Sequence, residues 1–132
     1  MIVHSHALCQ TIRDVVKAYP DQNLNGTGFV VHEPYACLIH HMSDFENLTS
    51  LDRDVTELEH LQVLLEFLQP RYKRYCIPAI ERSLTVQPMI RFDDLWLIMK
   101  PGSLGYVELN GYKHGCILDK CILFPPSPSK IA

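Results

Sequence analysis

The spacing of apolar and polar residues predicts helices in the first two-thirds of the chain. The short segment 2–4 begins with two β-branched residues, which predicts a first strand. Ser5 then stands where an N-cap would start a helix over about 6–18, in which apolar residues recur at helical spacing. Asn, Gly and Asp cluster in the turn-rich stretch 20–28. A second short strand is expected at 29–31, immediately after that loop.

Two sequence patterns mark further helix starts, because a polar cap is followed three residues later by glutamate. The first pairs Ser43 with Glu46, and the second pairs Asp54 with Glu57. The second opens the strongest helical pattern in the chain, residues 55–69. Its polar side chains fall on a stripe only about 80° wide, so we expect this helix to be packed on more than one side.

Proline and extended runs divide the next part of the chain. Pro70 is expected to end the long helix, since proline lacks the N–H that a helix needs. A further helical segment is predicted over about 72–84. The run 89–92 has the composition of a short strand, and Asp93 is expected to cap a turn of helix over 94–99.

The stretch 106–118 carries an Asn-Gly dipeptide at 110–111 between two extended runs, the sequence typical of a β-hairpin. A two-residue loop there places Glu108 opposite Lys113, where the two charges could form an ion pair.

A length of 132 residues fits one domain. We therefore predict an α+β domain over residues 1–124, with a helical N-terminal two-thirds containing short strands and a C-terminal β-hairpin or small antiparallel sheet. Residues 125–132 form a Pro/Ser-rich tail.

Charge and composition exclude several classes of function. The formal net charge is −3, and the basic residues are scattered except at 71–74, which argues against a nucleic-acid groove or a polybasic membrane contact. No apolar run approaches the roughly 18 residues of a membrane span, and no signal peptide is evident. A cytoplasmic location is therefore expected. The five cysteines contain no C-x-x-C pair, so we expect reduced thiols that mostly fill the core, with no metal and no cofactor.

Three histidines are candidates for catalysis: His40, His41 and His60. On an extended chain, neighbouring residues point to opposite sides, so one of His40 and His41 should face the core and the other solvent. His60 lies on the apolar arc of the long helix, and a neutral imidazole in a dry pocket can act as acid or base near pH 7. The three lack the i, i+4 spacing of a metal site. A structural role is the commoner one for half-buried histidines.

Four further side chains are candidates for binding: Tyr35, Phe67, Trp96 and Lys100. Trp96 could be a stacking platform, although a core anchor whose indole N–H needs a partner is the commoner role. Lys100 precedes the glycines of its loop, and a hairpin rather than a helix follows, which argues against a phosphate-binding loop.

Several stretches of the chain, taken in order, resemble the uncharacterised N-terminal module of large fungal AAA ATPases. The matching positions are Tyr19-Pro20, Pro34-Tyr35 with Leu38 and His40-His41, His60-Leu61 with Leu64, Phe67 and Leu68, and Phe92 and Leu95-Trp96 with Lys100-Pro101-Gly102. The resemblance covers residues 2 to about 118. It implies a fold and a fungal origin, and it supplies no catalytic residues. The motor domain of that family does not follow, so the chain is either a fragment or a freestanding descendant. The initiating Met and the unusual tail favour the freestanding form.

Two functional hypotheses follow, besides that of a decaying gene product. The first is a non-ATPase module that binds a protein partner or ligand, and it predicts an exposed apolar or aromatic patch. The second is a small cofactor-independent enzyme, a cyclase or isomerase acting on an apolar small molecule in a fungal biosynthetic pathway. It predicts an enclosed apolar pocket reached by His40, His41 or His60. The binding module is the more conservative of the two.

Overall fold

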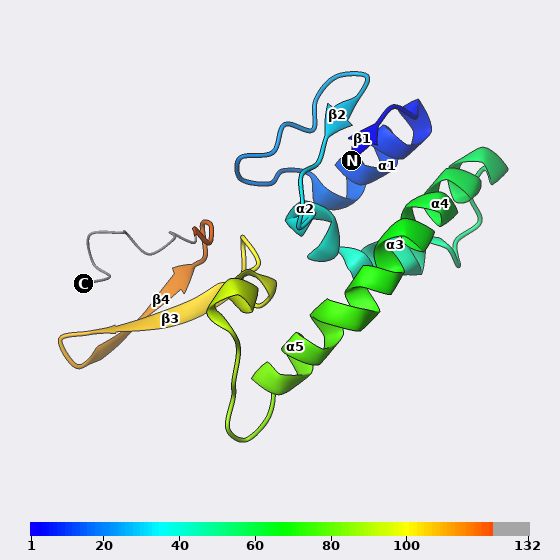
Figure 1. Ribbon diagram of the computed structural model, residues 1–132. Coiled ribbons are helices and arrows are strands. Elements are labelled where there is room, and N and C mark those ends of the chain that lie inside the picture. Colours follow the sequence, from blue (N-terminus) through cyan, green and yellow to red (C-terminus); the bar gives the residue numbers. More distant parts are fainter. Residues whose placement is uncertain (123–132) are drawn as a thin grey trace, which may run out of the picture.

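The computed structural model of the chain describes residues 1–122, and the expected Pro/Ser-rich tail lies outside them (Figure 1). The fold class is α+β, as the sequence pattern predicted. The elements in order are β1 (Ile2–Val3), α1 (His6–Val16), β2 (Phe29–Val30), α2 (Ala36–Ile39), α3 (Met42–Leu48), α4 (Val55–Arg71), α5 (Ile77–Ser83), β3 (Leu104–Leu109) and β4 (Tyr112–Ile117). A π-helical turn at Tyr72–Cys76 joins α4 to α5, and a 3-10 helix spans Phe92–Leu97.

The first helix begins as its sequence predicts. Ser5 has an extended backbone, and its hydroxyl accepts a hydrogen bond from the Leu8 N–H at 3.2 Å, which confirms the N-cap. The helix ends at Val16, two residues earlier than expected, because Lys17 adopts a left-handed φ of 62°. The strands β1 and β2 pair antiparallel beside it.

The prediction that Pro70 ends the long helix is wrong. Pro70 lies inside α4, and one helical rod runs from α4 through the π-helical turn to the end of α5 (Figure 1). Proline removes a single backbone hydrogen bond, which is not enough to stop a helix packed on a core. The helix becomes wider directly after Pro70, where the Ile77 N–H donates a hydrogen bond to the Tyr72 carbonyl five residues back. The π-helical turn thus carries the helical path on toward the second proline, Pro78.

The long helix buries one face only, contrary to the expectation of packing on several sides. Its buried residues are Leu61, Leu64, Leu65 and Leu68. In the described part of the chain, the separate helices that make the main contacts with α4 are α1 and α3. Val63 and Phe67 consequently remain 65% and 40% exposed.

Three local predictions need correction. Ser43 lies within the first turn of α3, because that helix begins at Met42 and the N-cap position belongs to His41. Asp54 does occupy the N-cap position of α4, but its side chain makes no capping hydrogen bond. The strand expected at 89–92 is absent from the described residues. The Met89 N–H there donates to the Arg82 carbonyl, so the segment folds back against the end of α5.

The N-cap position of the 3-10 helix is likewise not the one expected. Arg91 stands there in place of Asp93, and its carbonyl accepts a hydrogen bond from the Asp94 N–H.

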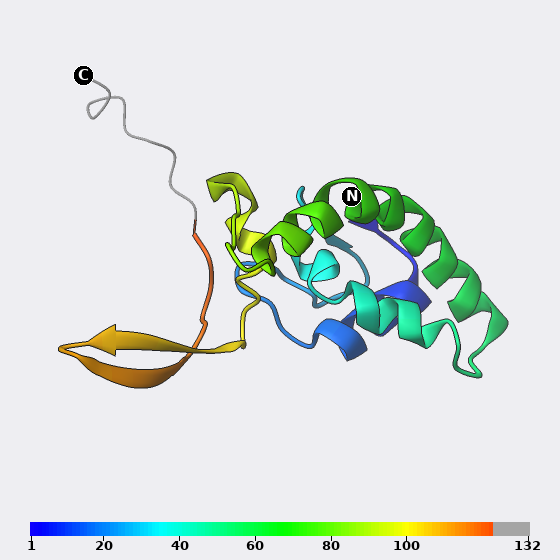
Figure 2. The ribbon, with the colours of Figure 1, turned by 90° about the horizontal axis from the view of Figure 1, so that it is seen from below.

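The C-terminal hairpin has the register that its sequence predicts. Asn110 and Gly111 adopt φ values of 52° and 80°, as a two-residue turn of the primed type requires. Glu108 faces Lys113 in the ladder, but the Lys113 ammonium lies over the Tyr106 ring, 5.0 Å from its centroid, instead of forming the expected ion pair. Figure 2 shows the hairpin projecting away from the helical body, and every residue of β3 and β4 is exposed.

The hydrophobic core lies between the long rod, α1, α2 and α3. Its largest fully buried side chains are Phe45, Ile12, Leu38, Met42, Leu61 and Leu68. Cys9, Cys37 and Cys76 are buried and unpaired, as expected of core thiols, whereas Cys116 is exposed. Among the helices of residues 1–122, none is both long enough and apolar enough to cross a membrane.

We predict that Phe45→Ala lowers the free energy of unfolding by about 3–5 kcal/mol, because a fully buried ring leaves a cavity. Urea unfolding followed by far-UV circular dichroism measures the change. Phe92→Ala is the matched control, since Phe92 is 60% exposed and its loss should cost less than about 1 kcal/mol. Equal losses in the two variants would contradict this placement of the core.

Candidate ligand-binding site

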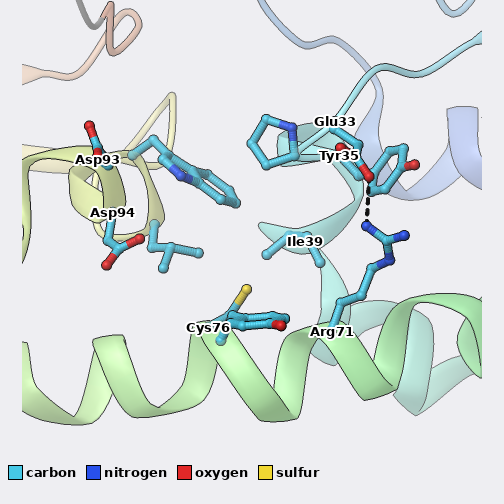
Figure 3. A pocket seen from close by; sticks show the side chains of 11 residues that line it. Glu33, Tyr35, Ile39, Arg71, Cys76, Asp93 and Asp94 are labelled. Carbon is cyan, nitrogen blue, oxygen red and sulfur yellow. Dashed lines mark hydrogen bonds and ion pairs between the residues drawn. The ribbon is translucent and has the colours of Figure 1, made fainter.

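A half-open pocket of about 660 Å³ lies between the start of α2, the long rod and the 3-10 helix (Figure 3). Ile39 and Leu97 give it apolar surface, and Pro34, Tyr75 and Trp96 add further wall. Its volume is within the range of small-molecule sites, roughly 300–1,000 Å³.

Tyr35 and Phe67, two of the expected binding residues, form one aromatic pair beside this pocket. Tyr35 precedes α2 with a left-handed φ of 61°, and its side chain is buried among the pocket residues. Its ring meets the Phe67 ring edge to face, with the centroids 5.5 Å apart. The contact ties the start of α2 to the long rod.

The end of the pocket at Tyr35 carries an ion pair. The Arg71 guanidinium contacts the Glu33 carboxylate at 2.8 Å, and it also lies 5.0 Å from the Phe67 centroid and 5.5 Å from that of Tyr35 (Figure 3). Cation–π attraction and the ion pair both hold Arg71 in place. Its charge is therefore already matched by a neighbouring carboxylate.

The opposite end of the pocket carries two carboxylates, Asp93 and Asp94 (Figure 3). Asp93 is exposed, whereas Asp94 is half-buried and close enough to Cys76 to affect its titration. Burial, and to a smaller degree the charge of Asp94, raises the pKa of the Cys76 thiol. Cys76 is therefore a neutral thiol at pH 7 rather than a nucleophile. Three carboxylates and one guanidinium line the pocket as a whole, an excess of negative charge.

His40 is held by hydrogen bonds on both sides of its ring. Its Nε2–H donates to the Trp96 carbonyl at 2.7 Å, and its Nδ1 accepts from the Tyr19 hydroxyl at 2.8 Å. Burial is the main cause of a lowered pKa for His40 and of a raised pKa, about 12, for Tyr19. Both groups are neutral at pH 7, and neither ring nitrogen of His40 is free for proton transfer.

The expectation that one of His40 and His41 faces the core and the other faces solvent is wrong. It assumed an extended chain, but His40 has helical dihedrals at the end of α2 and His41 directly precedes α3. Both side chains are half-buried. His41 Nδ1 contacts the Asp44 carboxylate at 3.3 Å. Burial lowers the pKa of His41, and the hydrogen bond to Asp44 opposes this effect only in part.

The structure does not bring the three candidate histidines together. His40 lines a small pocket of about 140 Å³ with Tyr19 and Trp96. His60 instead borders an open apolar groove of about 470 Å³ next to Phe67. That groove is not the enclosed pocket that the enzyme hypothesis expected.

Lys100 contributes no wall to the large pocket. Its positive charge helps to lower the pKa of both His40 and His41. Among the four expected binding residues, Tyr35 and Trp96 therefore line the pocket, Phe67 supports Tyr35, and Lys100 acts on neighbouring histidines.

Sequence reasoning missed part of the site. Glu33 and Arg71 are 38 positions apart, and no pattern in the chain indicates that they pair. Asp93 was expected to cap a helix, and Asp94 was not among the candidate site residues. The clustering of basic residues at 71–74 was visible, but it gave no sign that Arg71 alone would turn toward a pocket.

Comparisons of the chain with protein-family models, curated proteins and solved structures give no significant match. The relation to the N-terminal module of fungal AAA ATPases thus stays a hypothesis. Within residues 1–122, no three His, Cys, Asp or Glu side chains gather as a metal site requires.

We predict that the hydrogen-bonded His40 makes stability depend on pH. Because its pKa is lowered in the folded state, the neutral ring contributes its full stabilisation above the unfolded pKa of about 6.5, and this is lost as the pH falls below that value. Urea unfolding at pH values from 7.5 to 5 should show that the free energy of unfolding falls more steeply with pH for the native sequence than for His40→Gln. The two slopes should differ by less than about 1.4 kcal/mol per pH unit.

His114→Gln is the control for this experiment, since His114 is exposed on the hairpin. Its unfolding free energy should follow pH as the native sequence does. An unchanged pH dependence in His40→Gln would contradict the role given to His40.

Proposed function

We propose that the chain is a non-ATPase binding module whose pocket receives a cationic group carried on an apolar stem. The observation that carries this proposal is the placement of Trp96 beside Asp93 and Asp94 in one pocket of about 660 Å³. Aromatic and aliphatic walls suit an apolar stem, and the carboxylates suit a positive charge at its end.

Elementary electrostatics support a cation over an anion or a neutral group. Arg71, the one basic residue of the pocket wall, is already paired with Glu33. Asp93 makes a wider contact with the Arg91 guanidinium, at 3.9 Å, whereas Asp94 forms no ion pair among the described residues. A half-buried carboxylate such as Asp94 is screened less by solvent than an exposed one, so a charged hydrogen bond to it is worth more. The face of Trp96 adds cation–π attraction.

The exposed hairpin supports a role in recognition. A binding module was expected to show an exposed apolar or aromatic patch, and Leu104, Tyr106, Leu109, Tyr112 and Ile117 are all more than half exposed. The same role agrees with the resemblance to a domain that precedes an AAA motor. The cationic group could therefore come from a free amine or from a basic side chain of a protein.

The single tryptophan of the chain makes the proposal measurable, because Trp96 lines the pocket. Titration with phenethylamine should change its fluorescence, whereas the neutral phenylethanol and the anionic phenylacetate should bind more weakly. A peptide with one lysine between leucines, and the same peptide with glutamine, test the protein source. We predict that Asp94→Asn weakens binding of the cationic probes about tenfold, because a charged hydrogen bond is lost.

Asp52→Asn is the matched control, since Asp52 is an exposed carboxylate in the loop before α4. It should leave the affinity unchanged. Equal affinity for the three phenyl compounds, or full affinity in Asp94→Asn, would show that the pocket does not select cations.

A further inference from the structure

Ser5 and His60 both line a second cavity, which shares no lining residue with the acidic pocket. The Ser5 hydroxyl and His60 Nδ1 are in direct hydrogen-bond contact, and both side chains are half-buried. They border the apolar groove of about 470 Å³ between the N-terminal segment and α4. The rest of that groove is lined mainly by Met1, Ile2, Leu8, Val63, Leu64 and Phe67.

The local fold places the Ser5 hydroxyl in a positive field. The serine stands between the end of β1 and the first turn of α1, and the Leu8 N–H donates to its oxygen. The N–H groups of His6 and Ala7, in the same first turn, have no partner four residues back within the helix. Together with the helix dipole, these donors favour negative charge on or next to Ser5.

We propose that Ser5 and His60 form a serine–histidine dyad that hydrolyses esters of apolar acyl chains bound in the groove. A serine between a strand and a helix N-terminus, with a histidine in hydrogen-bond contact, is the arrangement that activates a hydroxyl nucleophile. The two residues are 55 positions apart, so only the fold brings them together. The proposal does not rest on the function proposed for the pocket at Trp96.

The proposed hydrolysis needs only the ester, water and the two side chains. His60 Nδ1 takes the hydroxyl proton as Ser5 Oγ bonds to the acyl carbon, and the N–H groups of the first turn face the resulting oxyanion. The C–O bond to the alcohol then breaks, and the alcohol leaves with the proton from His60. Water, deprotonated by His60, attacks the acyl-serine, and the carboxylic acid and free Ser5 are regenerated.

The groove determines which acyl groups fit. Its lining beyond the dyad and His4 is apolar, so affinity should rise with chain length, by up to about fourfold for each methylene that is fully buried. Because the groove is open, part of the chain stays in water. We expect p-nitrophenyl hexanoate to be hydrolysed at least about tenfold faster than p-nitrophenyl acetate at equal low concentration.

A covalent probe tests the nucleophile directly. The full chain, tagged at its C-terminal end, is incubated with an alkyl fluorophosphonate, in which Ser5 Oγ would displace fluoride and form an O–P bond. Intact mass and peptide mapping should show one adduct at Ser5, and hydrolysis of the hexanoyl ester should stop. Adducts on other residues would report only general surface reactivity and would count against the dyad.

Two variants separate catalysis from folding. Ser5→Asn keeps a strong N-cap but has no nucleophile, and His60→Gln keeps a polar partner for Ser5 but has no base. Far-UV circular dichroism should match the native sequence for both, while labelling and ester hydrolysis fall at least about a hundredfold. Unlabelled Ser5 in the native protein, or native rates in either folded variant, would overturn the proposal.

Discussion

The hydrogen-bonded His40 ring is the contact on which the geometry of the acidic pocket depends. It joins the Tyr19 hydroxyl, after α1, to the Trp96 carbonyl in the 3-10 helix, so three separate parts of the chain meet at one side chain. A buried polar group is stable only when it is hydrogen-bonded, and His40 has a partner on each nitrogen. The Trp96 backbone is thereby held against α2. This contact positions the indole and the two aspartates as one wall of the pocket.

The opposite wall depends on the rod being continuous. Had the helix ended at Pro70, Arg71, Tyr75 and Cys76 would belong to a separate segment. The π-helical turn instead keeps these residues on the rod and in one pocket lining. π-helical turns inside α-helices are often found at functional sites, because the extra residue changes which side chains face a given side. The pocket therefore lies where the regular 3.6-residue repeat is broken.

Local signals in the sequence were sufficient for much of the fold. The Ser5 cap, the Asn110-Gly111 hairpin and the long helix starting at Asp54 each depend on residues close together in the chain, and each was placed correctly. The errors at Pro70 and Ser43 arose because tertiary packing overrides local preference. The candidate site was harder to predict. Its ion pair, its histidine bridge and the contact between Ser5 and His60 all join distant positions, and one sequence carries no record of such contacts.

The two cavities differ because the long helix is covered unequally. Where its leucines meet α1 and α3 the core is closed, but Val63 and Phe67 stay exposed and form one side of an apolar groove. Farther along the rod, Phe67 and Arg71 pack with Tyr35 at the acidic pocket. Phe67 thus takes part in both places, one apolar and one rich in carboxylates. A ligand that displaces this ring from one cavity would change the shape of the other, so occupancy of the two sites should be linked through Phe67.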